Sequence, residues 1–186
     1  MEATVRTVQL PNEHVLIHQA QHGDRAAFAQ LVEHYWDRLY RWLCHLSHDR
    51  HAAEDIAQEA FMKALTAIAS FRTGSNFQAW LFRIAHNAFA NHVRARKRVR
   101  QAFPENLAST DQGPAELAMN KETMLLLARA VGRLPTEFRA AFLLRAEEEM
   151  SFQTIAEVLE ITEETARWRV FKARQKLMTA CGFAQD

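Results

Sequence analysis

The stretch SFQTIAEVLEITEETARWRVFKARQKL, residues 151–177, decides how the second half of the chain folds. Apolar residues recur at three- and four-residue steps on both sides of a short connection at 160–162, which is the layout of a helix-turn-helix. Ser151 and Thr162 each precede one helical pattern and can cap it. Two glutamates follow Thr162, where the positive end of a helix favours them. The pattern therefore predicts two short helices that meet at a tight turn.

The second of these helices has a core side and an outward side when its residues are projected around the helix axis. The core side collects Ala166, Val170, Ala173 and Leu177. Such a helix can lie in the major groove of DNA, with outward side chains near base edges and flanking arginines near phosphates. The residues that we expect to contact duplex DNA are Glu164, Thr165, Arg167, Trp168, Arg169, Lys172 and Arg174.

Helical periodicity also fills the first half of the chain. A short helix can start at Asn12 and stop at Gly23, and Asp24 and Asp49 can cap the next two. Residues 101–118 interrupt the pattern with Pro, Gly, Ser, Asn and Asp, which is typical of a linker. We therefore predict an all-α fold of two small helical domains, at 12–100 and 119–182, joined by a flexible linker at 101–118 and preceded by a disordered N-terminus at 1–11.

The charge of the chain is unevenly distributed, although its net value is only +1. No Asp or Glu occurs from Ala60 to Pro104 or from Thr165 to Gln185, and both stretches are rich in Lys and Arg. Two basic zones in a nearly neutral protein indicate two contacts with a polyanion, although a pair of solvated basic faces would give the same pattern.

The stretch NFQAWLFRIAHNAFANHVRARKR, residues 76–98, combines aromatic residues with an almost wholly basic end. Helical phase places Leu81, Ile84, Ala88 and Ala95 on its inner side, and Arg83, His86, Ala90, Val93 and Lys97 on its outer side. Phe82 and Phe89 fall near the boundary. Phe77 and Trp80, near the helix start, can close the core beneath the preceding loop.

The bulk composition is that of an ordinary globular protein, with 48 % apolar and 24 % charged residues. We find no apolar run long enough to span a membrane and no secretory signal, so we expect a cytoplasmic protein without direct membrane insertion. The two cysteines, Cys44 and Cys181, require no disulfide.

Several motifs in order resemble bacterial RNA polymerase sigma factors of the compact extracytoplasmic-function group. They are GDRAAFAQLVEHY (23–35), AEDIAQEAFMKAL (53–65), FRTGSNFQAWLFRIAHN (71–87) and the helix-turn-helix at 151–177. The resemblance covers roughly residues 12–178. It implies a subunit that directs RNA polymerase core to specific promoters and helps to open the strands at initiation.

The resemblance implies two surfaces in the first domain. One docks on the clamp helices of the largest polymerase subunit, through Asp55, Gln58, Glu59 and Met62. The other captures the minus-ten element as single-stranded DNA, with a flipped base held by the loop at 70–77. The residues that we expect at this second surface are Phe71, Arg72, Asn76, Phe77, Arg83, His86, Asn87, Arg94, Arg96 and Lys97.

For the second domain, the resemblance implies recognition of the minus-thirty-five element as duplex and a contact with the flap of the second-largest subunit. It also implies an anti-sigma factor that could clamp the domains into a closed form and hide both basic surfaces.

The sequence departs from the family pattern at three places near the helix-turn-helix. Trp168 stands where a small polar residue is usual, so it makes an unusual DNA contact or packs against a partner. Glu160 replaces a common turn glycine and must avoid a positive φ or accept strain. The segment at 146–150 lacks the usual glycine before Ser151.

Two other functions remain open. A helix-turn-helix regulator that binds duplex DNA without being a polymerase subunit would explain the second domain but not the aromatic and basic helix of the first. A metal enzyme or metal sensor could use His14, His18 and His22, or Cys44, His45 and His48. No general base completes a hydrolase motif near these histidines, and no phosphate loop or nucleophile is evident. We therefore predict no catalysis, no cofactor and no metal.

Overall fold

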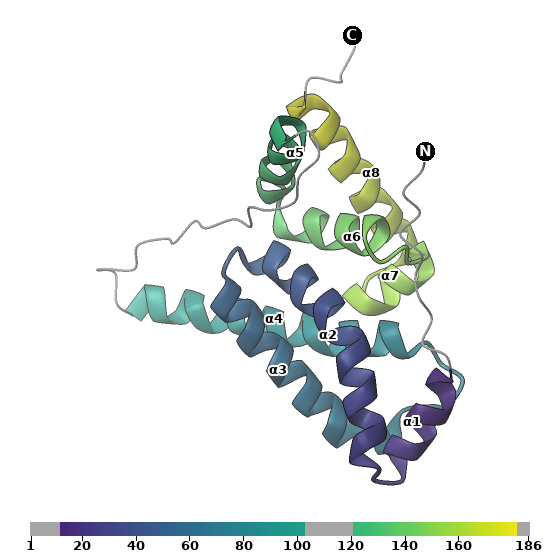
Figure 1. Ribbon diagram of the computed structural model, residues 1–186. Coiled ribbons are helices and arrows are strands. Elements are labelled where there is room, and N and C mark those ends of the chain that lie inside the picture. Colours follow the sequence, from purple (N-terminus) through teal and green to yellow (C-terminus); the bar gives the residue numbers. More distant parts are fainter. Residues whose placement is uncertain (1–11, 103–120, 182–186) are drawn as a thin grey trace.

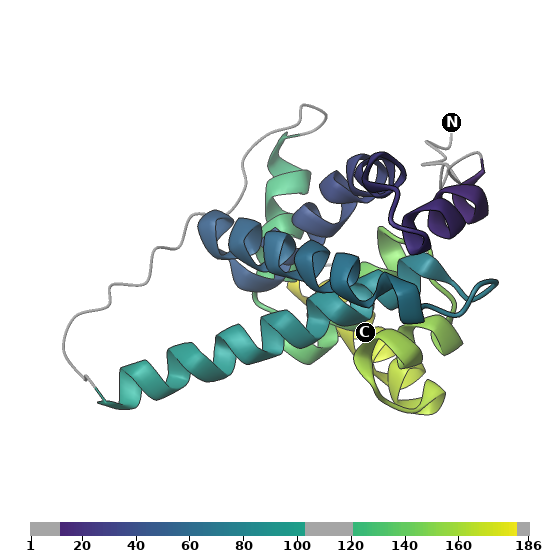
Figure 2. The same cartoon turned by 90° about the horizontal axis from the view of Figure 1, so that it is seen from below.

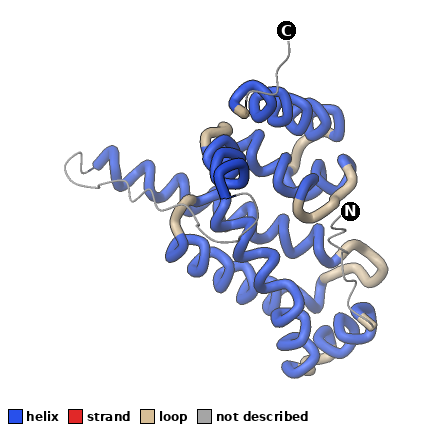
Figure 3. The backbone as a smooth tube through the Cα atoms, turned by 45° about the horizontal axis from the view of Figure 1, so that its top comes forward, coloured by secondary structure: helices blue, strands red, loops and turns tan. Residues whose placement is uncertain are grey.

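The computed structural model describes residues 12–102 and 121–181, and all regular structure within these ranges is helical (Figure 3). The predicted disordered N-terminus and most of the predicted linker lie outside the described residues. Gln101 and Ala102 belong to a helix, so the helical pattern continues two residues beyond the predicted linker start. Within the described ranges, no helix is long and apolar enough to cross a bilayer.

The first domain consists of four α-helices and one 3₁₀ turn. They are α1 (Glu13–Gln21), α2 (Arg25–Ser47), α3 (Arg50–Ala67), η1 (Ile68–Ser70) and α4 (Phe77–Ala102). The predicted caps are confirmed, since Asp24 accepts hydrogen bonds from the N–H groups of Ala26 and Ala27, and Asp49 accepts one from Ala52.

The second domain consists of α5 (Lys121–Gly132), α6 (Thr136–Ala146), α7 (Phe152–Leu159) and α8 (Glu163–Ala180). Helices α7 and α8 form the predicted helix-turn-helix. The side chains of Ser151 and Thr162 each accept a hydrogen bond from the backbone N–H group three residues later, that of Thr154 and that of Thr165. The four residues assigned to the core side of α8 are all buried.

The two domains pack against each other, and one apolar core runs through both. Helix α4 lies between α3 on one side and α7 on the other, and α6 packs against α2 (Figure 1). Figure 2 shows the C-terminal part of α4 extending beyond the rest of the molecule. The chain therefore adopts a closed arrangement in which the helix-turn-helix covers part of α4.

The structure changes the predicted sides of α4. Leu81 and Ala88 are buried as predicted, but Phe82 and Phe89, which we placed at the boundary, are also buried, at 0 % and 6 % exposure, and the ring of Phe82 packs against Trp42 of α2. The prediction that Ala95 lies on the inner side is wrong, because Ala95 is exposed, as are all residues of α4 from Val93 to Val99.

We expect Phe82→Ala to lower the free energy of unfolding by about 3–5 kcal/mol, because it leaves a cavity beside the buried ring of Trp42, 5.3 Å away. Phe171→Ala is the matched control, since Phe171 is 61 % exposed and its loss should cost little. Urea denaturation followed by circular dichroism measures both. Equal stabilities would show that Phe82 is not in the core.

Candidate nucleic-acid interfaces

The loop between η1 and α4 presents an exposed polar rim over an aromatic base. Residues 72–76 are exposed, and Gly74 takes a φ of +86°, which a side chain would disfavour. Beneath them the ring of Phe71 lies 5.5 Å from that of Phe77 and 5.0 Å from that of Trp80. Phe71 and Phe77 are 5 % and 2 % exposed, so they support the loop and present no face on which a base could stack.

Asn76 closes this loop as the cap of α4. Its side-chain oxygen accepts a hydrogen bond from the N–H of Ala79 at 2.9 Å. The cap uses only the side-chain oxygen of Asn76, so the NH₂ group of the same amide takes no part in this hydrogen bond. Asn76 can therefore hold the helix start and still offer a donor at the exposed rim.

The outer side of α4 faces the helix-turn-helix at two predicted contact residues. The guanidinium of Arg83 donates to one carboxylate oxygen of Glu160 from Nε at 2.9 Å and from Nη2 at 2.5 Å. His86 is half-buried, and burial lowers the pKa of its imidazole, with Glu160 and Arg169 as the nearby charges. The closed arrangement thus places a carboxylate where we expect a DNA strand.

The remaining predicted residues of α4 are accessible. Asn87 is exposed, as are Arg94, Arg96 and Lys97 in the C-terminal part of α4. Arg96 lies 3.6 Å from the carboxylate of Asp49, an exposed pair that salt screens and that is worth at most about 1 kcal/mol. Closure therefore reaches only the middle of the predicted strand surface, at Arg83 and His86, and leaves the loop at 72–76 and the basic end exposed.

The predicted duplex-contacting residues lie along α8, and most of them are exposed. Arg167 bonds to Glu163 at 2.7 Å and lies over the ring of Phe152, which fixes its direction. Lys172 donates to Gln175 at 3.1 Å. The other predicted residues are Glu164, Thr165, Trp168, Arg169 and Arg174, of which Thr165 and Arg169 are partly buried.

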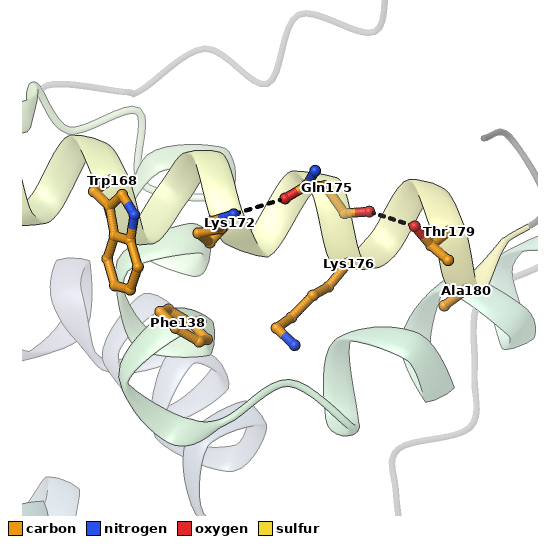
Figure 4. A pocket seen from close by; sticks show the side chains of 7 residues that line it. All are labelled: Phe138, Trp168, Lys172, Gln175, Lys176, Thr179 and Ala180. Atoms are coloured by element: carbon orange, nitrogen blue, oxygen red, sulfur yellow. Dashed lines mark hydrogen bonds between the residues drawn. The ribbon is translucent and has the colours of Figure 1, made fainter. Parts of the chain in front are cut away.

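Trp168 packs against the second domain itself. Its ring meets that of Phe138 on α6 at 5.4 Å, and half of the side chain stays exposed. Together with Lys172 and Lys176, the two rings line an open hollow of about 640 Å³ between α6 and α8 (Figure 4). The unusual tryptophan is thus held by an intradomain contact.

Two of the departures from the family pattern fall at strained positions. Glu160 has a φ of 55° and Glu149 a φ of 54°, the left-handed region that favours glycine. Each such residue costs about 1–2 kcal/mol relative to glycine. Of the two alternatives that the sequence left open for Glu160, the structure therefore shows a positive φ with its strain.

Comparison with known proteins places these surfaces in a family. The sequence matches the family model "Sigma-70 region 2" at residues 31–99 and the model "Sigma-70, region 4" at 124–177. It is 34 % identical to the RNA polymerase sigma-H factor of Pseudomonas aeruginosa over 173 residues, which cover 87 % of this chain and 90 % of that protein. It is 32 % identical to the ECF RNA polymerase sigma-E factor of Escherichia coli over 178 residues, covering 89 % and 92 %.

The chain belongs to the ECF RNA polymerase sigma factors. A solved structure agrees with this assignment. The sigma factor RpoE of Bartonella quintana, in complex with the anti-sigma factor NepR, superposes with a TM-score of 0.74 at 28 % identity, over 85 % of this chain and 98 % of that one.

The predicted polymerase-docking residues of this sigma factor share one open face of α3. Asp55, Gln58, Glu59 and Met62 are all exposed, and Met62 is 64 % exposed. Glu59 pairs with Lys63 one turn later at 2.5 Å. An exposed methionine within an acidic face is suited to a protein contact that joins apolar and charged groups.

The contacts between the two domains of the sigma factor are the main feature that the sequence did not reveal. Glu148 is buried, and one of its carboxylate oxygens binds Arg38 of α2 at 2.6 Å and the side-chain amide of Gln78 of α4 at 2.9 Å. Arg139 is 5 % exposed and donates to the backbone oxygen of Leu46, at the end of α2, at 2.9 Å. No local pattern signals these pairs, which lie 70 to 110 residues apart.

The two histidine clusters of this sigma factor differ in burial, since His45 and His48 are partly buried while His14, His18 and His22 are exposed. His45 pairs with Glu147 at 3.0 Å, and His48 accepts a hydrogen bond from Arg139, so both lie between the domains. The rings of His18 and His22 lie 4.4 Å apart on α1. Across 12–102 and 121–181, no three His, Cys, Asp or Glu side chains are placed to share a metal ion.

The two roles of Asn76 in this sigma factor can be separated by substitution. Asn76→Ala removes the cap and should lower the free energy of unfolding by about 1 kcal/mol. Asn76→Asp keeps the accepting oxygen and should leave stability unchanged or raise it, since the helix start favours an anion. Urea denaturation of both variants tests the cap. If Asn76→Ala has the same unfolding midpoint in urea as the wild type, the cap does not contribute to stability.

Proposed function

We propose that this chain directs RNA polymerase core to specific promoters and assists strand separation there, without catalysing a reaction itself. The observation that carries the proposal is the order of two matched sigma regions on one chain, a basic α4 in the first and a helix-turn-helix in the second. Relatives that carry the name of sigma factors match over most of the chain.

The first proposed contact is with the polymerase. The exposed side of α3, defined by Asp55, Gln58, Glu59 and Met62, would meet the clamp helices of the largest subunit. The cap at Asp49 fixes the start of α3, and the helix packs against α2 with its buried alanines on the side away from this face. The second domain would contact the flap of the second-largest subunit.

The second proposed contact is with the separated minus-ten strand. Taking a base out of the stack costs a few kcal/mol, and it must be balanced by contacts to the flipped base and to phosphates. The exposed loop at 72–76 supplies polar groups and the projecting end of α4 supplies arginines and a lysine. Arg83, His86 and Asn87 lie between these two parts on α4, so one strand could run along the helix from loop to basic end.

The third proposed contact is with duplex DNA at the minus-thirty-five element, through α8. Arg174 and Arg167 are exposed on its flanks, where they could meet phosphates, while Glu164 and Thr165 lie in the first turn, which enters the groove. An α8 anchored in this way would set the distance at which the first domain meets the minus-ten strand.

An anti-sigma factor is a further proposed partner. The solved structure of RpoE contains such a protein, NepR, and its sigma chain has the same fold. In this chain, a partner that holds the domains closed would keep Arg83 against Glu160 and so occupy the middle of the strand surface.

A regulator that binds duplex DNA without the polymerase is the competing function. Such a regulator would need α8, but it would not explain the region 2 domain, which the family model matches across residues 31–99. A measurement of binding to the core enzyme distinguishes the two functions, because only a sigma factor binds it.

In vitro transcription with core enzyme and a pool of genomic fragments tests the proposal. Addition of the protein should give promoter-dependent transcripts, because region 2 and region 4 surfaces are both present. Core enzyme alone is the control. If the full protein yields no promoter-dependent product from any fragment, the proposed function is wrong.

The docking face is tested by Asp55→Arg combined with Glu59→Arg. Reversing two exposed charges at i and i+4 should weaken binding to core at least about 100-fold, since like charges would then meet across the contact. Glu33→Arg with Asp37→Arg is the matched control, because it makes the same charge change at the same spacing on exposed positions of α2. Core affinity is measured by fluorescence anisotropy, and equal losses for both pairs would contradict the assignment.

A further inference from the structure

A single glutamine on α1 holds the loop to which we assign base capture. The side-chain nitrogen of Gln21 donates to the backbone oxygens of Ile68 at 3.1 Å and Phe71 at 2.7 Å. Its side-chain oxygen accepts a hydrogen bond from the hydroxyl of Thr73 at 3.4 Å. Gln21 is the last residue of α1, so three contacts from one side chain join this helix to both the entry and the first turn of the loop.

These contacts add to a helix that is also anchored elsewhere in the domain. Helix α1 already packs on α2 through Leu16, Ile17 and Ala20, all buried. Gln21 itself is only partly buried, and the carbonyls that it satisfies belong to the segment that leads into the exposed rim. A primary amide suits this role, because one end donates to carbonyls while the other accepts from a hydroxyl.

We propose that Gln21 is a positioning residue for strand capture, which it serves by setting the shape of the loop at 70–76. This inference rests on the proposed capture of a flipped base by that loop. Loss of Gln21 leaves the loop attached but free to sample other shapes, so the flipped base loses its preformed site. The phosphate contacts on the basic end of α4 are unaffected.

The test uses a single-stranded oligonucleotide of the minus-ten element, taken from a promoter recovered by transcription, and a series with one abasic site at each position. The wild-type protein should lose most affinity at one position, which marks the flipped base. Gln21→Ala and Gln21→Glu, whose carboxylate cannot donate, should bind the intact strand about 5- to 30-fold more weakly. Both should match the wild type on the strand that lacks the flipped base.

Gln19→Ala is the control, since Gln19 is an exposed glutamine two residues earlier on α1. The inference is overturned if Gln21→Ala binds like Gln19→Ala. It is also overturned if the loss persists on the abasic strand, because the effect would then be a general weakening of the domain. If the wild type shows no sensitive position, the proposed base capture itself is wrong.

Discussion

The pairing of one buried carboxylate governs how the two domains of this sigma factor fit together. The side chain of Glu148 is 1 % exposed, and burial raises the pKa of its carboxyl while the guanidinium of Arg38 opposes that shift. Removing one partner of a buried ion pair costs about 3–5 kcal/mol. Because Arg38 and Gln78 come from α2 and α4, their bonds to Glu148 fix the second domain over both helices. Closure and this pairing therefore depend on each other.

The same closure gives three sides of α4 different roles. One side fills the core with α3, a second side receives α7, and the outer side carries the residues that we assign to DNA. DNA binding on the outer side competes only with the packing of the helix-turn-helix, since Glu160 bonds to Arg83 and His86 is half-buried near it. The basic end of the helix stays free in the closed arrangement (Figure 2). A phosphate backbone could thus make first contact there before the domains separate.

Features encoded by neighbouring residues could be predicted from the sequence. The caps at Asp24, Asp49 and Thr162 and the core side of α8 follow from local hydrogen bonding and helical phase, and the structure contains all of them. Features that depend on distant partners could not. Phe82 is buried against Trp42 of another helix, α2, and the pairing of Arg38 with Glu148 joins residues 110 apart with no signal in either segment. Phe71 and Phe77 show the same limit, since an aromatic residue near a loop has one sequence signature whether it stacks on a base or supports the loop.

The distance between the two domains in the free protein and in its complex with core enzyme tests this account most directly. Spin labels on exposed positions of α3 and α7, such as Glu54 and Gln153, report it by pulsed electron resonance once Cys44 and Cys181 are replaced by serine. The account predicts one narrow, short distance for the free protein and a longer distance with core enzyme and promoter DNA. A broad distribution in the free protein, or the same short distance in the complex, would contradict it.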